Sequence, residues 1–315
     1  TKIYDEVNDV WVNVTKTYTV EGNWTRTVTN SVTIAGLGQP TDTAISPDGK
    51  FFYVVTGYFL SANTVGGYTS CSVDNNDCLN QIGYITAFAR DPTDGSLLWS
   101  SSLRIGTVNL RKIKISSDGK FVYIIEYDSG KVYTLSRDTS TGVVTELDTI
   151  EDCAGNTASC ETVGFSRFLD GATDMAFSSD EAHLYVVTHV DRKIIAYARN
   201  STSGLLTYLE AYQPANRYFT CITISRDDRH VYVGSVSQSS DTSATGNIFM
   251  YERDSTTGLM TLITIDNDDA ASYGFTSSVL RNGAVDTIQN PYTNTDRMRH
   301  PRVMVMDIND NYVYA

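Results

Sequence analysis

The stretch Ile45-Ser46-Pro47-Asp48-Gly49-Lys50-Phe51-Phe52-Tyr53-Val54-Val55 decides the fold, because four later segments repeat its pattern. The clearest copy covers residues 115–125 and reads Ile-Ser-Ser-Asp-Gly-Lys-Phe-Val-Tyr-Ile-Ile. Shorter copies begin at Phe177, Ile224 and Met306. Each copy places Asp, and often Gly, between an apolar segment and a segment of aromatic and β-branched residues. This pattern predicts two strands joined by a tight turn.

A second pattern follows each of the first four copies. An arginine is followed by Asp or Asn and, five positions after the arginine, by glycine; the pairs are Arg90 and Gly95, Arg137 and Gly142, Arg199 and Gly204, and Arg253 and Gly258. Asp or Asn can bond its own backbone in a turn, and glycine accepts a positive φ, so this pattern predicts a second hairpin. Two hairpins in each unit predict an all-β chain of four-stranded antiparallel blades, which is a β-propeller.

The spacing of the copies predicts the domain organisation. The shortest unit, from Ser178 to Ser225, spans 47 residues, and the longer units carry insertions at about 59–81, 150–170, 236–246 and 266–299. We expect four complete blades over 36–302, partial blade strands over 1–35, and the first hairpin of a further blade over 303–315. Either the two ends complete one shared blade of a five-bladed ring, or the chain is an excerpt of a larger ring, which the patterning favours. In the second case missing sequence or a neighbouring subunit supplies the remaining strands.

Composition excludes several classes of protein. The 315 residues are 41% hydrophobic and 19% charged, which is typical of a globular chain. The net charge of −13 argues against nucleic-acid binding, because phosphate contacts need clustered Lys and Arg. No apolar run approaches the roughly 18 residues of a membrane-spanning helix. The first residues contain neither Met nor an apolar signal segment, so we expect a mature or excised product.

The cysteines and glycosylation sequons predict an oxidising compartment. Two C-x6-C pairs lie in the insertions, and we expect the disulfides Cys71–Cys78 and Cys153–Cys160, with reduced surface thiols as the alternative. Sequons for N-linked glycans begin at Asn13, Asn23 and Asn200. Together they predict an extracellular or cell-surface location. The fifth cysteine, Cys221, falls on a predicted inner strand, and we expect a buried, inert thiol.

The two repeated patterns resemble those of lactonase-type β-propellers. The residues that carry the resemblance are Ser-Pro-Asp-Gly-Lys from Ser46, the following Tyr-Val-Val, and the general form Tyr-x-Arg-Asp-x-x-x-Gly-x-Leu of the second pattern. Similar proteins include 6-phosphogluconolactonase-like and carboxymuconate-cyclase-like propellers and the YVTN repeats of surface-layer proteins. The resemblance covers about residues 36–315 and implies the propeller fold, with seven blades in the family. It leaves the activity open, because one fold hosts many functions.

The resemblance implies that a lactonase would use His and Arg residues near the inner strands, often in a His-Pro pair before a blade. Only His300, followed by Pro301 and Arg302, keeps that pattern, and Arg111 is the other candidate. General acid–base chemistry needs a positioned set of groups, so one such histidine predicts no catalytic site. Of the other histidines, His183 and His230 are expected in exposed hairpin turns and His189 near a loop.

The positions four residues before the repeated serine are expected to line the channel. They include Asp42, Lys112 and Asp174, whose mixed charges indicate either a small polar-ligand site or a solvated channel with paired charges. Acidic loops at 74–77 and 266–269 are rich in the oxygen ligands that calcium prefers. They lack a complete calcium-binding motif, and we predict neither a metal nor a cofactor.

Three functional hypotheses follow. The first is a non-enzymatic, glycosylated extracellular propeller that serves as a structural or adhesive module of a cell-surface layer, appendage or filament. It would associate with itself or with other extracellular structural proteins. The second is a lactonase-like hydrolase that uses His300, Arg302 and the Arg111 region. The third is a propeller that binds a small ligand or a glycan.

Overall fold

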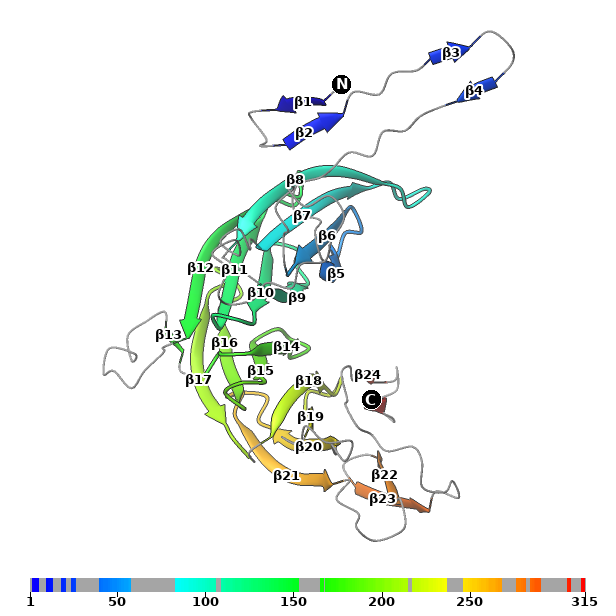
Figure 1. Ribbon diagram of the computed structural model, residues 1–315. Coiled ribbons are helices and arrows are strands. Elements are labelled where there is room, and N and C mark those ends of the chain that lie inside the picture. Colours follow the sequence, from blue (N-terminus) through cyan, green and yellow to red (C-terminus); the bar gives the residue numbers. More distant parts are fainter. Residues whose placement is uncertain are drawn as a thin grey trace, which may run out of the picture. The chain divides into compact units, whose positions relative to one another are not determined.

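The computed structural model describes residues 40–57, 83–105, 109–152, 168–214, 217–236 and 246–267, together with short strands outside these ranges by their backbone alone. Every regular element in the described part is a β-strand, so the predicted all-β fold of four-stranded antiparallel blades is confirmed (Figure 1). The described part contains no helix that could cross a membrane.

Four blades each contain four strands in sequential antiparallel order. Blade 1 contains β5 (Pro40–Ile45), β6 (Phe51–Thr56), β7 (Gly83–Arg90) and β8 (Leu97–Ile105). Blade 2 contains β9 (Leu110–Ile115), β10 (Phe121–Glu126), β11 (Lys131–Arg137) and β12 (Val144–Asp152). Blade 3 contains β14 (Ala172–Phe177), β15 (His183–Thr188), β16 (Ile194–Arg199) and β17 (Leu206–Tyr212). Blade 4 contains β18 (Tyr218–Ile224), β19 (His230–Val236), β20 (Gly246–Arg253) and β21 (Met260–Asn267).

Short strand pairs lie outside the blades. Near the N-terminus, β1 (Lys2–Asp5) pairs with β2 (Val10–Asn13), and β3 (Tyr18–Val20) pairs with β4 (Trp24–Arg26). Towards the C-terminus, β22 (Thr276–Arg281) pairs with β23 (Ala284–Gln289), and β24 (Val305–Met306) pairs with β25 (Val313–Tyr314). The sequence did not predict β13 (Phe165–Ser166), which adds a parallel fifth strand beside β12.

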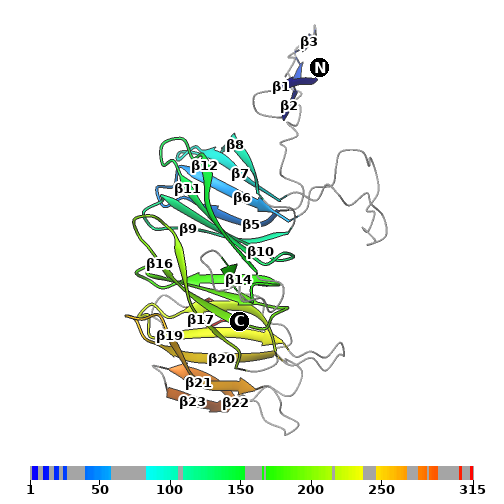
Figure 2. The ribbon, with the colours of Figure 1, turned by 90° about the vertical axis from the view of Figure 1, so that its left-hand side faces the viewer.

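The chain divides into two compact units. Unit 1 comprises 1–109 with the turn 138–143, and unit 2 comprises 110–137 with 144–315. Within unit 2, the sheets of blades 3 and 4 lie side by side (Figure 2). Their first strands, β14 and β18, contact each other.

The core of unit 2 forms between the blades. On β15, Leu184 and Val186 pack into a cluster shared with blade 2, whereas Tyr185 and Val187 pack into a cluster shared with blade 4. Both faces of this strand are therefore buried, and alternate side chains serve different neighbours. This explains the run of apolar and aromatic residues from Leu184 to Val187 in β15.

A repeated polar contact, which we call the interblade latch, explains why the tyrosine, arginine and glycine recur. The hydroxyl of Tyr185 in blade 3 donates a hydrogen bond to the carbonyl of Gly258 in blade 4 at 2.6 Å. The same hydroxyl accepts a hydrogen bond from Nε of Arg253 at 2.8 Å. Between blades 2 and 3, Tyr123 bonds Gly204 and Arg199 in the same way, at 2.6 and 2.7 Å.

Replacing Tyr185 by Phe should lower the free energy of unfolding by about 1–3 kcal/mol, because a buried carbonyl and a buried guanidinium lose their partner. The matched control is Tyr133→Phe, since the Tyr133 hydroxyl is buried with no hydrogen-bond partner. Removing that hydroxyl should leave stability unchanged or raise it slightly. Urea unfolding of both variants measures the difference, and equal losses would contradict the latch.

Two histidines differ from their predicted positions. His183 does not lie in an exposed turn: it is the first residue of β15 and is only 5% exposed. His230 is the first residue of β19 and is half-buried. Both strands begin at the histidine, because the serine hydroxyl of each turn accepts a hydrogen bond from the backbone N–H of that residue. For His183 this bond joins its N–H to the hydroxyl of Ser178 at 3.0 Å. The prediction of exposure was therefore wrong for His183.

Candidate functional site

A β-bulge interrupts the first strand of every blade at the same position. The pairing register between the first and second strands skips one residue in each blade: Thr41, Arg111, Thr173 and Thr220. The three threonine hydroxyls donate to carbonyls of the second strand, each at 3.2 Å, and so close the bulge locally. Arg111 has no hydroxyl for this contact. Bulges often redirect a side chain beside a functional site, and blade 2 uses its bulge to present a guanidinium.

Arg111 is the first member of a cluster of cationic and aromatic side chains in unit 2. Its guanidinium lies over the ring of Tyr127, 4.7 Å from the ring centroid. The ring of Tyr127 is 6.5 Å from that of His189, which stacks on Tyr218 with centroids 4.4 Å apart. The guanidinium of Arg192 lies 4.8 Å from the centroid of Tyr218. We call these five residues the Arg–His cluster, and they come from blades 2, 3 and 4.

Backbone hydrogen bonds position the members of the Arg–His cluster. The Gly171 N–H donates to the carbonyl of Tyr127 at 2.9 Å, and the His189 N–H donates to the carbonyl of Gly171 at 2.7 Å. Gly171 has a φ of +73°, and an added Cβ would lie 2.5 Å from the nitrogen of Val190. Only glycine therefore allows the start of blade 3 to approach the turn that carries His189 so closely.

His189 is neutral at physiological pH. Burial lowers its pKa below the ordinary value of 6.5, the charges of Arg111 and Arg192 lower it further, and a hydrogen bond to the backbone of Phe219 opposes the shift. That bond fixes the ring, and among the described residues no other side-chain hydrogen bond of His189 is found. A half-buried neutral imidazole between two guanidinium groups can accept a proton beside a developing negative charge.

The predicted channel residues fall on the first strands of their blades. In unit 2, Nζ of Lys112 lies 3.9 Å from Oδ1 of Asp174, and Asp174 accepts a hydrogen bond from the backbone N–H of Ile222 at 3.0 Å. Burial raises the pKa of Asp174, while the charge of Lys112 and the backbone bonds oppose the rise. The carboxylate thus links three blades. Asp42 is half-buried on β5 in unit 1.

Cys221 is fully buried on β18, where burial raises the pKa of its thiol to about 11. Such a thiol stays protonated at neutral pH and is a poor nucleophile, as expected. No group of three metal-ligating side chains occurs among the residues that the structure describes. Asn200 lies exposed in the turn between β16 and β17, where its Oδ1 accepts hydrogen bonds from the N–H groups of Thr202 and Ser203.

Several predicted residues lie outside the described residues. These are His300 and Arg302, the four cysteines Cys71, Cys78, Cys153 and Cys160, the sequon residue Asn23, and the acidic loop 74–77. Asn13 is described only as the last backbone position of β2. The structure brings Arg111 together with four residues that the sequence did not predict to belong to a site. Two signals existed: Arg111 breaks a column of threonines, and His189 directly follows a predicted strand.

Comparison with known proteins supports the resemblance noted from the repeats. A family model described as "Lactonase, 7-bladed beta-propeller" matches residues 25–162, and the resemblance to lactonase-type propellers is thereby confirmed. No curated protein matches the chain.

Solved structures are also similar to the chain. A protein from Lactobacillus plantarum is 18% identical over 72% of this chain and 71% of that chain, with a TM-score of 0.50. A putative 6-phosphogluconolactonase from Bacteroides uniformis is 14% identical over 87% and 76% of the two chains, with a TM-score of 0.49. The periplasmic gluconolactonase of Pseudomonas aeruginosa is 14% identical over 88% and 81%, with a TM-score of 0.43.

Proposed function

We propose that the chain hydrolyses a lactone at the Arg–His cluster. This is the activity of the second hypothesis, with His189 beside Arg111 in place of His300 and Arg302. The observation that carries the proposal is the set of contacts of His189 with Tyr127 and Tyr218, each of which lies under a guanidinium group. Burial and the charges of Arg111 and Arg192 lower the pKa of the imidazole and so favour its neutral form. The match to a lactonase family model over residues 25–162 supports the same class of substrate. The sequence predicted no catalytic site because only His300 was expected near the channel. His189 is a second histidine, and it lies in a cluster with two arginines.

The proposed reaction assigns one role to each kind of group. The neutral imidazole of His189 takes a proton from water while the water oxygen attacks the lactone carbonyl carbon. The guanidinium of Arg111 stabilises the negative charge that develops on the carbonyl oxygen. The ring C–O bond then breaks, and the leaving oxygen takes the proton back from the imidazolium. The product is an open-chain hydroxy acid, and no other reactant is required.

The two guanidinium groups further favour a substrate with a carboxylate or phosphate group. The whole chain carries a net charge of −13, so an anionic substrate depends on local cations of this kind for attraction. Tyr127 and Tyr218 each hold one guanidinium in place by contact with the ring, which reduces the entropy lost when an anion binds.

Arg111→Thr tests the proposal with a residue that this bulge accepts, because threonine occupies it in blades 1, 3 and 4. We expect the native chain to open sugar lactones that carry an anionic group. The rate is measured by pH-stat titration of the acid that is released. The variant should lose about 10- to 100-fold in kcat/KM, since a charge-assisted hydrogen bond contributes about 1.5–3 kcal/mol. Its melting temperature should stay unchanged.

Arg104→Thr is the matched control, because Arg104 is exposed on β8 in unit 1. It should retain full turnover. Absence of turnover by the native chain with every lactone tested would overturn the hydrolase proposal. Ligand binding without turnover would favour the third hypothesis, a ligand-binding propeller.

A glycosylated structural or adhesive module of a cell-surface layer, appendage or filament is the second candidate function. The exposed position of Asn200 supports it, because an exposed turn accommodates a glycan at little cost. We expect native material to carry a glycan at Asn200 and two disulfides in the insertions, and to be extracellular. Treatment with a glycosidase should lower the mass of the peptide that contains Asn200, and an unchanged mass would argue against this candidate.

A further inference from the structure

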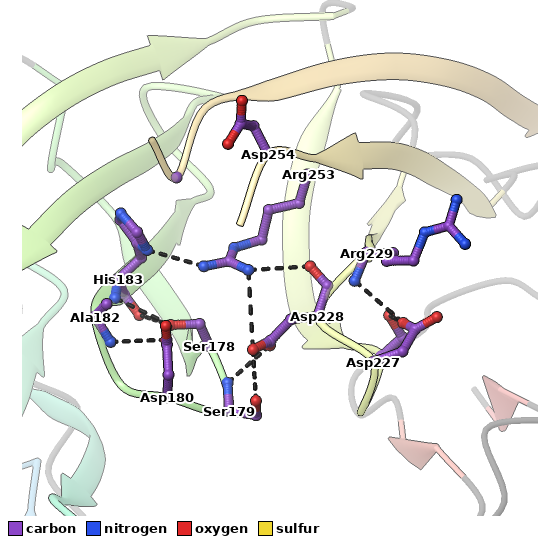
Figure 3. A network of polar contacts seen from close by, with 12 residues as sticks. Ser178, Ser179, Asp180, Ala182, His183, Asp227, Asp228, Arg229, Arg253 and Asp254 are labelled. Atoms are coloured by element: carbon purple, nitrogen blue, oxygen red, sulfur yellow. Dashed lines mark hydrogen bonds and ion pairs between the residues drawn. The ribbon is translucent and has the colours of Figure 1, made fainter. Parts of the chain in front are cut away.

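The contact between blades 3 and 4 depends on histidines at both ends of one strand. His183 is the first residue of β15, and His189 follows its last residue, Thr188. His183 contacts Arg253 of blade 4, and His189 stacks on Tyr218 of blade 4. We call this contact the 3–4 seam, and Figure 3 shows the end that contains His183.

Hydrogen-bond chemistry fixes the protonation state of His183. Nη2 of Arg253 lies 2.8 Å from Nδ1 of His183. A guanidinium can only donate, so Nδ1 must be an unprotonated acceptor. A proton on Nδ1 would remove this bond and place two positive charges in contact inside the protein, where Arg253 is 4% exposed.

The seam gives a protonated His183 little freedom to move. A Cβ on Gly258 would lie 2.1 Å from Cδ2 of the His183 ring, so the backbone of blade 4 covers the imidazole. The charged groups that face it come from four elements. They are Arg253 at the end of β20, Asp180 in the turn before β15, Asp228 in the turn before β19, and Asp254 in the turn after β20.

The equivalent seam between blades 2 and 3 lacks the titrating group. Phe121 occupies the position of His183, and the ring of Phe121 packs against Gly204 as His183 packs against Gly258. Arg199 still bonds Tyr123, but its Nη2 is buried without a partner. We call this contact between blades 2 and 3 the 2–3 seam. It contains the same latch, but a phenylalanine takes the place of the histidine.

We propose that the 3–4 seam is an acid-labile joint, which opens when His183 is protonated while the 2–3 seam stays closed. His189, at the other end of the same strand, contacts Tyr127 of blade 2 and Tyr218 of blade 4, so its titration does not distinguish the two seams. The opening at His183 does not depend on whether the Arg–His cluster is catalytic.

The direction of the pH effect follows from linkage. Burial, then the charge of Arg253, lower the pKa of His183 in the folded state below its ordinary value of 6.5. Folding therefore favours the neutral form. The stability that this provides is complete above about pH 6.5 and is lost as the pH falls through the lower folded-state value. The pKa of Asp180 is lowered below 3.8 by hydrogen bonds that outweigh its burial, so that group titrates in more acidic solution.

Hydrogen–deuterium exchange of the full chain tests the joint, with labelling times matched for the intrinsic effect of pH. We expect the peptides that contain Ser179 and Arg253, whose N–H groups bond across or beside the 3–4 seam, to exchange at least tenfold faster at pH 5.0 than at pH 7.5. Peptides that contain Ser117, which bonds Glu181 at the 2–3 seam, should show no such change.

Two variants separate titration of His183 from other causes. His183→Phe copies the 2–3 seam, and His183→Gln supplies an acceptor that does not titrate; both should remove most of the acceleration at pH 5.0. His189→Gln and His230→Gln should not change it. Equal acceleration at both seams, or acceleration that persists in both His183 variants, would overturn the proposal. Failure of His183→Phe to fold leaves His183→Gln to decide it.

Discussion

Replacing His189 by Gln is expected to lower kcat for lactone opening by about 10²- to 10⁴-fold, the range contributed by a general base. Glutamine keeps an N–H donor for the backbone of Phe219 but cannot accept a proton from water. The matched control is His230→Gln, since His230 lies outside the Arg–His cluster, with its ring 6.4 Å from that of Tyr232. The control should retain full activity.

The pH dependence provides a readout that a merely structural role of His189 would not change. Because burial and the two arginines lower the pKa of His189, the base is neutral above about pH 6.5. We expect kcat/KM to be constant there and to fall as the pH drops through the lowered value. The variant should lose this acidic limb while its melting temperature at pH 7.5 stays near that of the native chain. An unchanged acidic limb in the variant would assign the base to another residue.

Gly204→Ala is expected to lower the free energy of unfolding by about 3 kcal/mol. The left-handed backbone, with a φ of +76°, costs an alanine about 1–2 kcal/mol. The new Cβ would also lie 2.3 Å from Cδ1 of Phe121 on the neighbouring blade, and such overpacking costs about 1–3 kcal/mol more.

Blade 1 offers the matched control for this prediction. Gly95 occupies the same turn with a φ of +77°, but a Cβ there would have nothing within 4 Å. Gly95→Ala should therefore cost only the backbone term of about 1–2 kcal/mol. Urea unfolding of both variants measures the difference. Equal losses of unfolding free energy would mean that the turn of blade 3 moves to accommodate the new Cβ without disturbing blade 2.

The sequence predicted the strands well because each residue of the repeat has a local reason to be there. The serine, the aspartate and the glycine of the turns act within a few residues, so their pattern reports structure directly. The sequence did not reveal why Tyr123 and Tyr185 recur, because their hydroxyls form hydrogen bonds with residues 81 and 73 positions away. A repeat marks such a residue as required and does not show what it contacts.

The Arg–His cluster was harder to predict for a related reason. Arg111 was visible as an exception among threonines, but the residues equivalent to His189 are Gly57, Tyr127 and Val236, which share no chemistry. The cluster forms only because neighbouring blades bring the ends of β10, β15 and β18 together. Aligned repeats place residues within a blade, whereas a site of this kind depends on contacts between blades.

The interblade latch has a direction along the chain, and this affects how the protein is made. Each tyrosine reaches forward, so the second strand of a blade is completed by a turn 73 to 89 residues later. At a synthesis rate of about 5–20 residues per second, that turn leaves the ribosome roughly 4–18 seconds after the tyrosine. The tyrosine hydroxyl of each newly made blade therefore lacks its partner until the next blade has been synthesised. The blades assemble in the order in which they are translated.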